Sequence, residues 1–270
     1  MRLPAVKGAV LAAAFAFLAV PAAAQSFWLD HESPELSLEV LRPAPAGGDL
    51  TFFSFTAFAT MAAQVGESAL LVVEVPFSRA EVDVAGADGE TALGNPYVGI
   101  RSMPEAATGL RWSGGVRIPL ASDDAGVATI TGLMSSASDR YEAFLPDVVA
   151  VSAAGRYVAA LSDVAYLSGR LGGVLDIITE GGNDAEFFAL YGGKVWVESD
   201  GLNAGLGFSG RYWLSDEDAA FGDRTLHELG IWADYDFGGV RPGIRVQFPL
   251  GELGDLVDQV VGLYVRYPLP

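Results

Sequence analysis

The 270-residue chain contains no cysteine, only two histidines, and fewer than half as many basic as acidic residues. Without cysteine there are no disulfides and no thiolates to act as ligands or nucleophiles. The two histidines, His31 and His227, stand far apart, and the carboxylates around them show no metal-ligand spacing. A net charge of −18 excludes nucleic acid as an expected partner.

Signals of catalysis are equally sparse. A serine hydrolase would have to use His227, which adjoins Glu228, but no G-x-S-x-G motif accompanies it. We therefore expect no catalytic residue, no metal and no cofactor, and we classify the chain as a non-enzyme. His227 is interpreted as a surface or girdle residue, and His31 as part of a disordered or periplasmic leader.

Long apolar runs are also absent, with one exception at the N-terminus. Arg2 and Lys7 precede the run GAVLAAAFAFLAVPAAA, which ends in A-A-A at residues 22–24. This layout is typical of a secretory signal peptide cleaved after Ala24. The alternative, a membrane-anchor helix, is disfavoured because the run is short of a span and contains Pro21. The predicted organisation is a signal peptide at 1–24, an N-terminal leader at 25–34 and one domain at 35–270.

What the chain does have is alternation of apolar and polar residues. In LRWSGGVRIPL, residues 110–120, Leu110, Trp112 and Val116 share one parity, and Arg111 and Arg117 share the other. A strand places alternate side chains on opposite faces, so this segment predicts a strand with one apolar and one polar face.

The same pattern recurs along the chain and predicts its fold. Strands are expected near 35–42, 50–61, 67–77, 96–102, 108–120, 148–162, 164–178, 185–198, 201–214, 226–238, 240–250 and 260–269. A soluble sandwich also alternates. However, the segments are long, their apolar faces end in aromatics, and their polar faces hold glycine and charges of both signs, as in membrane barrels. We predict an all-β fold, an antiparallel up-and-down transmembrane β-barrel of about twelve strands, within a range of 10–14.

Turn signals support a meander, and one region departs from it. Gly47-Gly48-Asp49, Asp200-Gly201 and Gly238-Gly239 predict hairpins, and Asp163 predicts a further turn. Residues 123–147 do not alternate. Asp139 followed by Glu142 resembles a capping box, so we expect a short helix or an inward-folded loop there.

The polar parity defines a candidate inner face. Its predicted pore-lining residues are Arg101, Arg111, Arg117, Arg170, Lys194, Arg211, Arg245, Arg266, Glu74, Asp176, Glu186, Glu198, Asp234, Asp236, Tyr97, Trp196, Trp213 and Trp232. Two further aromatics, Tyr166 and Tyr264, share this parity. The set is consistent with a narrow channel whose charged rows shape the field. It is also consistent with a closed lumen in which ion pairs stiffen the barrel.

A resemblance adds to this reading. The segment L-G-N-P-Y-V-G-I-R, residues 93–101, resembles a segment of outer-membrane transporters of the meta-pathway of phenol degradation family. The strand 109–120 with its R-I-P-L ending and the D-F-G-G-V-R-P-G hairpin, residues 236–243, fit the same pattern. The resemblance implies a Gram-negative outer-membrane barrel that passes small hydrophobic or aromatic compounds. The chain departs in ending Y-P-L-P, where many outer-membrane barrels end in an aromatic residue.

The expected function is therefore a passive channel for small solutes in the outer membrane. The alternatives are a structural or adhesive barrel with a sealed lumen and a soluble secreted β-protein that binds an apolar ligand. The expected partners are outer-membrane lipid, a small solute of unknown identity and the barrel-assembly machinery during insertion.

Overall fold

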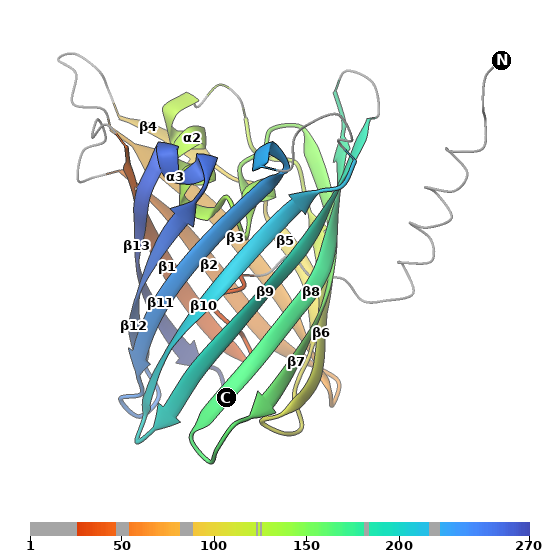
Figure 1. Ribbon diagram of the computed structural model, residues 1–270. Coiled ribbons are helices and arrows are strands. Elements are labelled where there is room, and N and C mark those ends of the chain that lie inside the picture. The colour runs from red at the N-terminus through yellow and green to blue at the C-terminus, as the bar shows by residue number, and fades with distance from the viewer. Residues whose placement is uncertain are drawn as a thin grey trace.

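The computed structural model describes residues 26–46, 54–81, 89–122, 124, 126–180, 184–215 and 222–270. The predicted signal peptide and the Gly47-Gly48-Asp49 turn lie outside these ranges. The described residues form one closed antiparallel barrel, with both chain ends of the sheet meeting at β1 and β13 (Figure 1).

Thirteen strands build the described wall. They are β1 (Glu35–Pro45), β2 (Phe55–Val65), β3 (Ala69–Ala80), β4 (Glu90–Leu93), β5 (Tyr97–Ser102), β6 (Gly109–Arg117), β7 (Val148–Ala160), β8 (Ala165–Ile178), β9 (Ala185–Ser199), β10 (Leu202–Trp213), β11 (Thr225–Tyr235), β12 (Arg241–Leu250) and β13 (Val257–Pro268). Apart from β4 and β5, which both pair with β3, each strand pairs with its sequence neighbours, and the β1–β13 pairing closes the ring. Closure leaves no long exposed edge, which lets a sheet survive in lipid.

The strands β4 and β5 are two halves of one wall position. Both pair with β3, with Phe77 opposite Leu93 and Glu74 opposite Tyr97. The break between them falls at Gly94-Asn95-Pro96, where proline cannot donate to the ladder. The wall therefore has twelve strand positions, which confirms the predicted fold class.

Most predicted strands lie close to their observed positions, with differences at the ends. The strand predicted at 50–61 is wrong by four residues at its C-terminal end, because residues 62–65 continue to pair with β3. The half-strand β4 has no counterpart in the prediction, and β13 begins three residues earlier than the predicted 260. The short β4 has too few residues for alternation to reveal.

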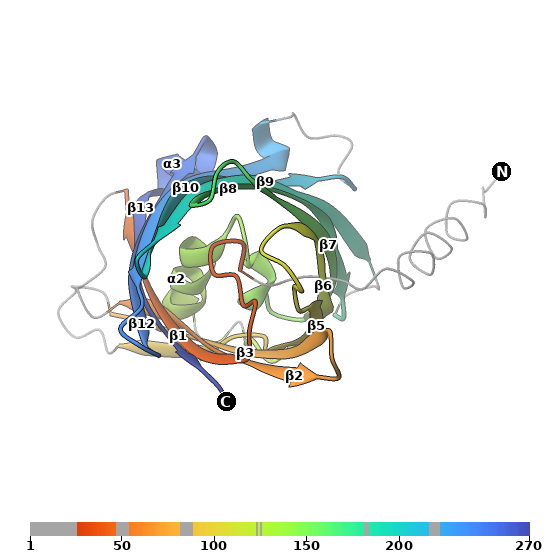
Figure 2. The ribbon, with the colours of Figure 1, turned by 90° about the horizontal axis from the view of Figure 1, so that it is seen from below.

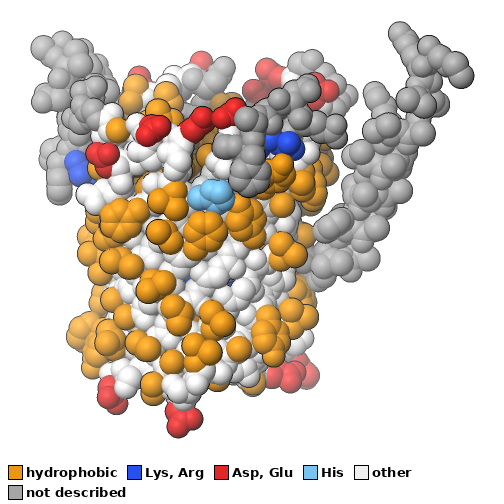
Figure 3. Space-filling model, in the orientation of Figure 1, with side chains coloured by type: hydrophobic (Ala, Val, Ile, Leu, Met, Phe, Trp, Pro, Cys, Tyr) orange, Lys and Arg blue, Asp and Glu red, His pale blue; other side chains and the backbone are white. Residues whose placement is uncertain are grey.

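The predicted apolar parity lies on the outside of the wall. In β6 and its extension Leu110 is 73% exposed and Leu120 is 54% exposed, whereas Arg117 is fully buried. Figure 3 shows apolar side chains spread over the outer surface of the barrel, with acidic side chains gathered near its two ends. A continuous apolar exterior is the surface expected of a membrane barrel and excludes the soluble alternative. In the described residues no helix has the length and apolarity to cross a bilayer.

Short turns join the strands at the end where the C-terminus lies (Figure 1). Asp200 and Gly201 both have positive φ, as the predicted two-residue hairpin requires, and residues 161–164 form the turn predicted at Asp163. Asp236, predicted to line the pore, instead caps the Gly238–Gly239 turn. Its carboxylate accepts the N–H groups of these two glycines, and these bonds, with one from Arg241, lower the pKa of Asp236 below its ordinary value.

The connection between β6 and β7 folds into the barrel. It contains α2 (Gly126–Ser136) and a single 3-10 turn, η2 (Tyr141–Ala143). Seen from below, α2 lies inside the ring of strands (Figure 2). The predicted capping box is wrong: the residue before η2 is Arg140, without a side-chain cap, and Asp139 is engaged elsewhere. The broader expectation of a short helix or an inward-folded loop is correct, since this connection contains α2 and enters the ring.

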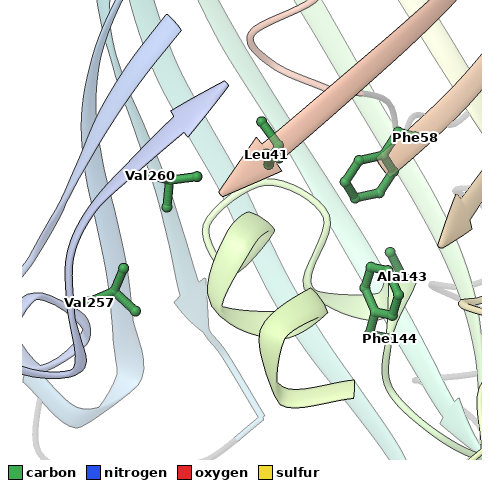
Figure 4. Packing of buried hydrophobic residues seen from close by; sticks show 6 residues of the cluster. All are labelled: Leu41, Phe58, Ala143, Phe144, Val257 and Val260. Atoms are coloured by element: carbon green, nitrogen blue, oxygen red, sulfur yellow. The ribbon is translucent and has the colours of Figure 1, made fainter. Parts of the chain in front are cut away.

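An apolar cluster anchors this connection against the wall (Figure 4). It consists of Leu41, Phe58, Ala143, Phe144, Val257 and Val260, all fully buried. The rings of Phe58 and Phe144 meet edge to face with centroids 6.1 Å apart. The connection is therefore held by packing as well as by polar contacts.

The segment before β1 also enters the barrel. Phe27, Trp28 and Leu29 are at most 5% exposed, and His31 is 3% exposed. Figure 2 shows this segment inside the ring, beside α2. The expectation of disorder at His31 is wrong, since the imidazole is buried and its Nδ1 lies 2.5 Å from a Glu35 carboxylate oxygen.

The α3 helix (Glu252–Leu256) and the η3 turn (Gly222–Arg224) lie at the end with the longer connections. They complete the described connections without entering the ring (Figure 2).

Candidate functional site: the occupied lumen

The candidate site is the lumen, because the charges of the wall converge there. Burial places most of the predicted inner-face charges inside the barrel, where the set Glu74, Arg101, Arg111, Arg117, Asp176, Lys194, Arg211, Asp234 and Arg245 is at most 7% exposed. Two chain segments share this space with them. We call residues 26–34 the N-terminal insert and the described part of residues 118–147, which enters the ring at α2 and η2, the loop insert.

The aromatic side chains of the N-terminal insert pack directly against the backbone of wall glycines. A Cβ on Gly230 would lie 2.7 Å from the Trp28 ring, and one on Gly192 would lie 2.8 Å from the Phe27 ring. The Trp28 Nε1 donates to Glu228 at 2.7 Å. Wall glycines therefore form slots for these two rings, and only glycine leaves enough room there.

The same insert supplies carboxylates to the cations of the wall. Asp30 lies 2.9 Å from the Lys194 Nζ, 3.5 Å from an Arg101 nitrogen, and also pairs with Arg156. Glu32 pairs with Arg111 and Arg156. Arg111 is buried on the inner side of the wall, and its ion-pair partner Glu32 belongs to the insert and not to another strand.

The loop insert provides the reverse arrangement, a cation held by acids of the wall. The Arg140 guanidinium pairs with Glu39 and lies 3.1 Å from Glu74. Glu74 also accepts from Arg117 at 2.6 Å, and Arg245 lies 2.8 Å from Glu39. Each of these five side chains is at most 4% exposed, so the network is shielded from solvent.

Further bonds join the two inserts to each other and to the wall. The Phe27 backbone N–H donates to the Asp139 carboxylate at 2.7 Å, and Arg170 lies 3.4 Å from the same carboxylate. Arg211 pairs with Glu142. The inserts therefore form one connected polar structure across the lumen.

Asn95, at the break in the wall, clasps both ends of the loop insert. Its Nδ2 donates to the Glu142 and Leu145 carbonyls at 2.9 and 2.6 Å. Its Oδ1 accepts the N–H groups of Leu120 and Ala121, both at 2.7 Å. All four hydrogen-bonding positions of the amide are used, which explains why an amide residue suits this point.

The lumen near the short turns keeps an open space. A cavity of about 140 Å³ is lined by residues that include Trp28, Asp30, Lys194, Trp196 and Trp232. Another part of its lining is a small cluster around Asp234, whose carboxylate accepts from Tyr264 at 2.9 Å and Arg266 at 3.0 Å.

The remaining predicted residues are spread along the barrel. The Tyr97 ring covers the backbone of Gly99 and Gly115, since a Cβ on either glycine would lie within 2.6 Å of the ring. Trp213 stacks on Phe188 with ring centroids 5.8 Å apart. At the strand ends, Glu198 is exposed and accepts from Trp196, whose ring stacks on Tyr166. Asp176 is 2% exposed and faces its neighbour Glu186 across the β8–β9 pair. Their role in lining a path stays a prediction.

Several residues of the site escaped the sequence analysis. Glu39, Arg156 and Glu228 share the inward parity of their strands, so alternation could have identified them. Asp30, Glu32, Asp139 and Arg140 lie in segments without alternation, and no local signal places them in a lumen.

The described residues contain no candidate metal site. No group of three or more histidine, aspartate or glutamate side chains there could hold a metal ion. The Nε2 of His227 lies 2.5 Å from the Tyr191 hydroxyl, and its ring stacks on Phe208. This aromatic group has the parity of the apolar outer face, in accord with the girdle interpretation.

The closed wall and its apolar exterior define an antiparallel transmembrane β-barrel. No protein-family model and no curated protein sequence matches the chain.

Three solved structures share this fold at low sequence identity. An outer-membrane channel from Pseudomonas putida F1 has a TM-score of 0.58 at 12% identity, covering 90% of this chain and 98% of that one. The NanC porin has a TM-score of 0.54 at 6% identity, covering 87% of this chain and 100% of that one. The β-domain of the Bordetella autotransporter Brka has a TM-score of 0.51 at 11% identity, with 88% and 100% covered. At these identities the likeness concerns the fold.

Proposed function

We propose that the chain is an outer-membrane channel for small solutes whose lumen the N-terminal insert occupies. Two of the three similar structures are themselves a channel and a porin, which supports this class. The short-turn end would face the periplasm, as short turns do in outer-membrane barrels. Outer-membrane location, a cleaved signal peptide, contact with lipid and assistance from the barrel-assembly machinery belong to the same proposal.

The observation that carries the proposal is the kind of contact that fills the lumen. A lumen closed by apolar packing would expose an apolar core when it opens. Instead, the N-terminal insert fills much of the lumen near the short turns, and it binds the wall through ion pairs and two aromatic rings. Such a segment can leave without exposing an apolar core, because the surface it uncovers is charged and bears glycine backbone.

The solute class follows from the resemblance and from the lining. The L-G-N-P-Y segment at 93–97, which resembles the phenol-degradation transporters, contains the wall break at Asn95. The lumen offers aromatic surfaces at Trp196 and Trp232. We therefore propose small aromatic or hydrophobic solutes as the cargo, and membership of that transporter family as the origin of the resemblance.

Solute permeability of proteoliposomes tests the proposal. Vesicles containing the full chain are expected to swell in isosmotic solutions of small solutes faster than protein-free vesicles. A control protein with Ile231→Arg, which places a charge on the lipid face, should insert poorly and give little swelling. Swelling equal to that of protein-free vesicles, with insertion confirmed by heat-modifiable gel migration, would contradict a channel.

The second candidate is a sealed structural barrel, and one observation favours it. Arg140, Glu39 and Glu74 form a solvent-shielded network that fixes the loop insert. Under this candidate, replacement of the N-terminal insert contacts would leave the vesicles as impermeable as before. Under the channel proposal, the same replacement would increase permeability.

A further inference from the structure

Four cations of the wall gather around the N-terminal insert. Arg101, Arg111, Arg156 and Lys194 come from β5, β6, β7 and β9, and their side chains are at most 8% exposed. We call them the cationic patch. The insert brings only two carboxylates to them, from Asp30 and Glu32.

The patch therefore has unused capacity for anions. Within the described residues, Arg101 Nη1 and Arg156 Nε have no hydrogen-bond acceptor, although both atoms are buried. Buried donors of this kind are costly unless an acceptor reaches them. The ion pairs of the patch favour a further anionic group, since two carboxylates pair with four cations there.

Aromatic surfaces lie directly beside the cations. The Lys194 Nζ lies 4.5 Å from the centroid of the Phe27 ring and 5.5 Å from that of Trp232. The slots at Gly192 and Gly230 hold the rings of Phe27 and Trp28. The wall thus accommodates flat rings within reach of positive charge, an arrangement that cation–π attraction stabilises.

Space for a further ring remains with the insert in place. The cavity of about 140 Å³ contacts Lys194, Trp196 and Trp232. A cavity of about this volume accommodates one benzene ring. Displacement of Trp28, which lines the same cavity, would enlarge it toward the Gly230 slot.

We propose that the cationic patch and its glycine slots form a binding site for aromatic carboxylates, and that residues 27–32 occupy it as an intramolecular ligand. The proposal rests on the channel function above and names its cargo more narrowly. The insert itself has this chemistry, since the Phe27 and Trp28 rings precede the Asp30 carboxylate. A solute that combines a ring with a carboxylate can replace both kinds of contact.

The chemistry predicts discrimination against related solutes. A neutral aromatic compound would fill a slot but leave the cations without a partner, and an aromatic amine would be repelled. A simple carboxylate such as acetate would pair with the cations but leave the slots empty. Ring and carboxylate are both needed for strong binding.

The test uses the full-length chain with F27S, W28S, D30S and E32S together, which we call the undocked variant. In planar bilayers, phenylacetate is expected to reduce its current at concentrations about tenfold lower than acetate, 2-phenylethanol or phenethylamine, a difference of about 1.4 kcal/mol. A synthetic peptide with the sequence of residues 26–32 should block the same variant.

Variants of the patch complete the design. Adding K194Q or R156Q to the undocked variant should remove the preference for phenylacetate. R79Q, at a cation that pairs with Glu81 and is 42% exposed, should preserve it. Equal block by all four compounds, in a variant that conducts, would overturn the aromatic-carboxylate site and leave the channel function standing. An undocked variant that inserts but does not conduct would overturn the channel function itself.

Discussion

Arg140 fixes the loop insert to the wall through ion pairs with two strands. Its guanidinium joins Glu39 of β1 to Glu74 of β3, and all three side chains are shielded from water. Buried ion pairs add little net stability over apolar packing, but removing one partner leaves an uncompensated charge. The loop insert therefore depends on this residue more than its place in a non-alternating segment would suggest.

Arg140→Met is expected to lower the free energy of unfolding by about 3–5 kcal/mol, because Glu39 and Glu74 lose their common partner. The measurement is urea unfolding in detergent micelles, followed by intrinsic fluorescence. Adding E39Q and E74Q to this variant should recover a large part of the loss. Arg79→Met, at an exposed cation, should cost far less, and a similar cost for both arginine variants would contradict the network.

The lipid face is tested at two depths on one strand. Leu206 lies in the middle of β10 and is 55% exposed, and Leu202 begins the same strand with the same parity. Leu206→Arg should cost about 2–4 kcal/mol and Leu202→Arg at most about 1 kcal/mol, as arginine does at the midplane and at the interface. Folding into lipid vesicles, followed by gel migration, measures both. Equal costs would mean that this face does not contact acyl chains.

For single residues, the sequence predicts which face of the wall a side chain lies on, but not which residue it pairs with. Arg111 and Arg117 face inward as their parity requires. The wall partner of Arg117 is Glu74, one of the predicted acids, whereas the partner of Arg111 is Glu32 of the N-terminal insert. Alternation fixes the face of a side chain, but it carries no information about which distant segment meets it.

Among the elements, the two inserts differ in how they are attached. The loop insert is tied to the wall at both ends and carries an apolar cluster around Phe144. The N-terminal insert is joined to β1 at one end, and its main contacts are rings in slots and ion pairs. The N-terminal insert is therefore the one suited to move.

Gly230→Val tests the slot. Its side chain would overlap the Trp28 ring, which lies 2.7 Å from the position of a Cβ. Such overpacking costs about 1–3 kcal/mol and should undock the insert. Single-channel recording should then show longer or larger openings. Gly169→Val is the matched control, because a Cβ there meets no atom within 4 Å. Unchanged openings in Gly230→Val would show that Trp28 does not restrict the path.

Asn95→Leu tests the clasp of the loop insert. The substitution removes four hydrogen bonds and leaves buried backbone groups without partners, at about 1–3 kcal/mol for each unsatisfied group. Hydrogen exchange of residues 118–147 should accelerate. Gln64→Leu removes one exposed bond to Gly66 and should leave this exchange unchanged. Slow exchange in the Asn95 variant would place the anchoring elsewhere, in the Phe144 cluster.

Long strands could be predicted, whereas broken strands and inserts could not. The ten or more alternating residues of β7 to β12 give a strong periodic signal. The four residues of β4 are too few for such a signal, and α2 is apolar without a clear periodic face. The N-terminal insert is nine residues of mixed polarity, and its position depends on slots and cations that come from five distant strands.

For the whole molecule, the balance of charge inside the barrel decides which ions can pass. The N-terminal insert neutralises part of the cationic patch, and the chain as a whole is acidic. In the undocked variant the cationic patch is open to the lumen, and the carboxylates of Asp30 and Glu32 that paired with it are gone. Rows of cationic side chains favour anions.

The undocked variant is accordingly expected to be anion-selective. The reversal potential in a salt gradient measures this selectivity, and K194Q and R156Q should shift it toward cations. Cation selectivity in the undocked variant would show that acids such as Asp234 and Glu198 dominate the field of the path.

The comparison of single-channel conductance between the full chain and the undocked variant tests most directly whether the N-terminal insert closes a continuous lumen. The account predicts rare, small openings of the unmodified chain and stable, larger ones of the undocked variant, with the peptide of residues 26–32 restoring closure. Equal conductance of the two proteins, both inserted as heat-modifiable barrels, would contradict it.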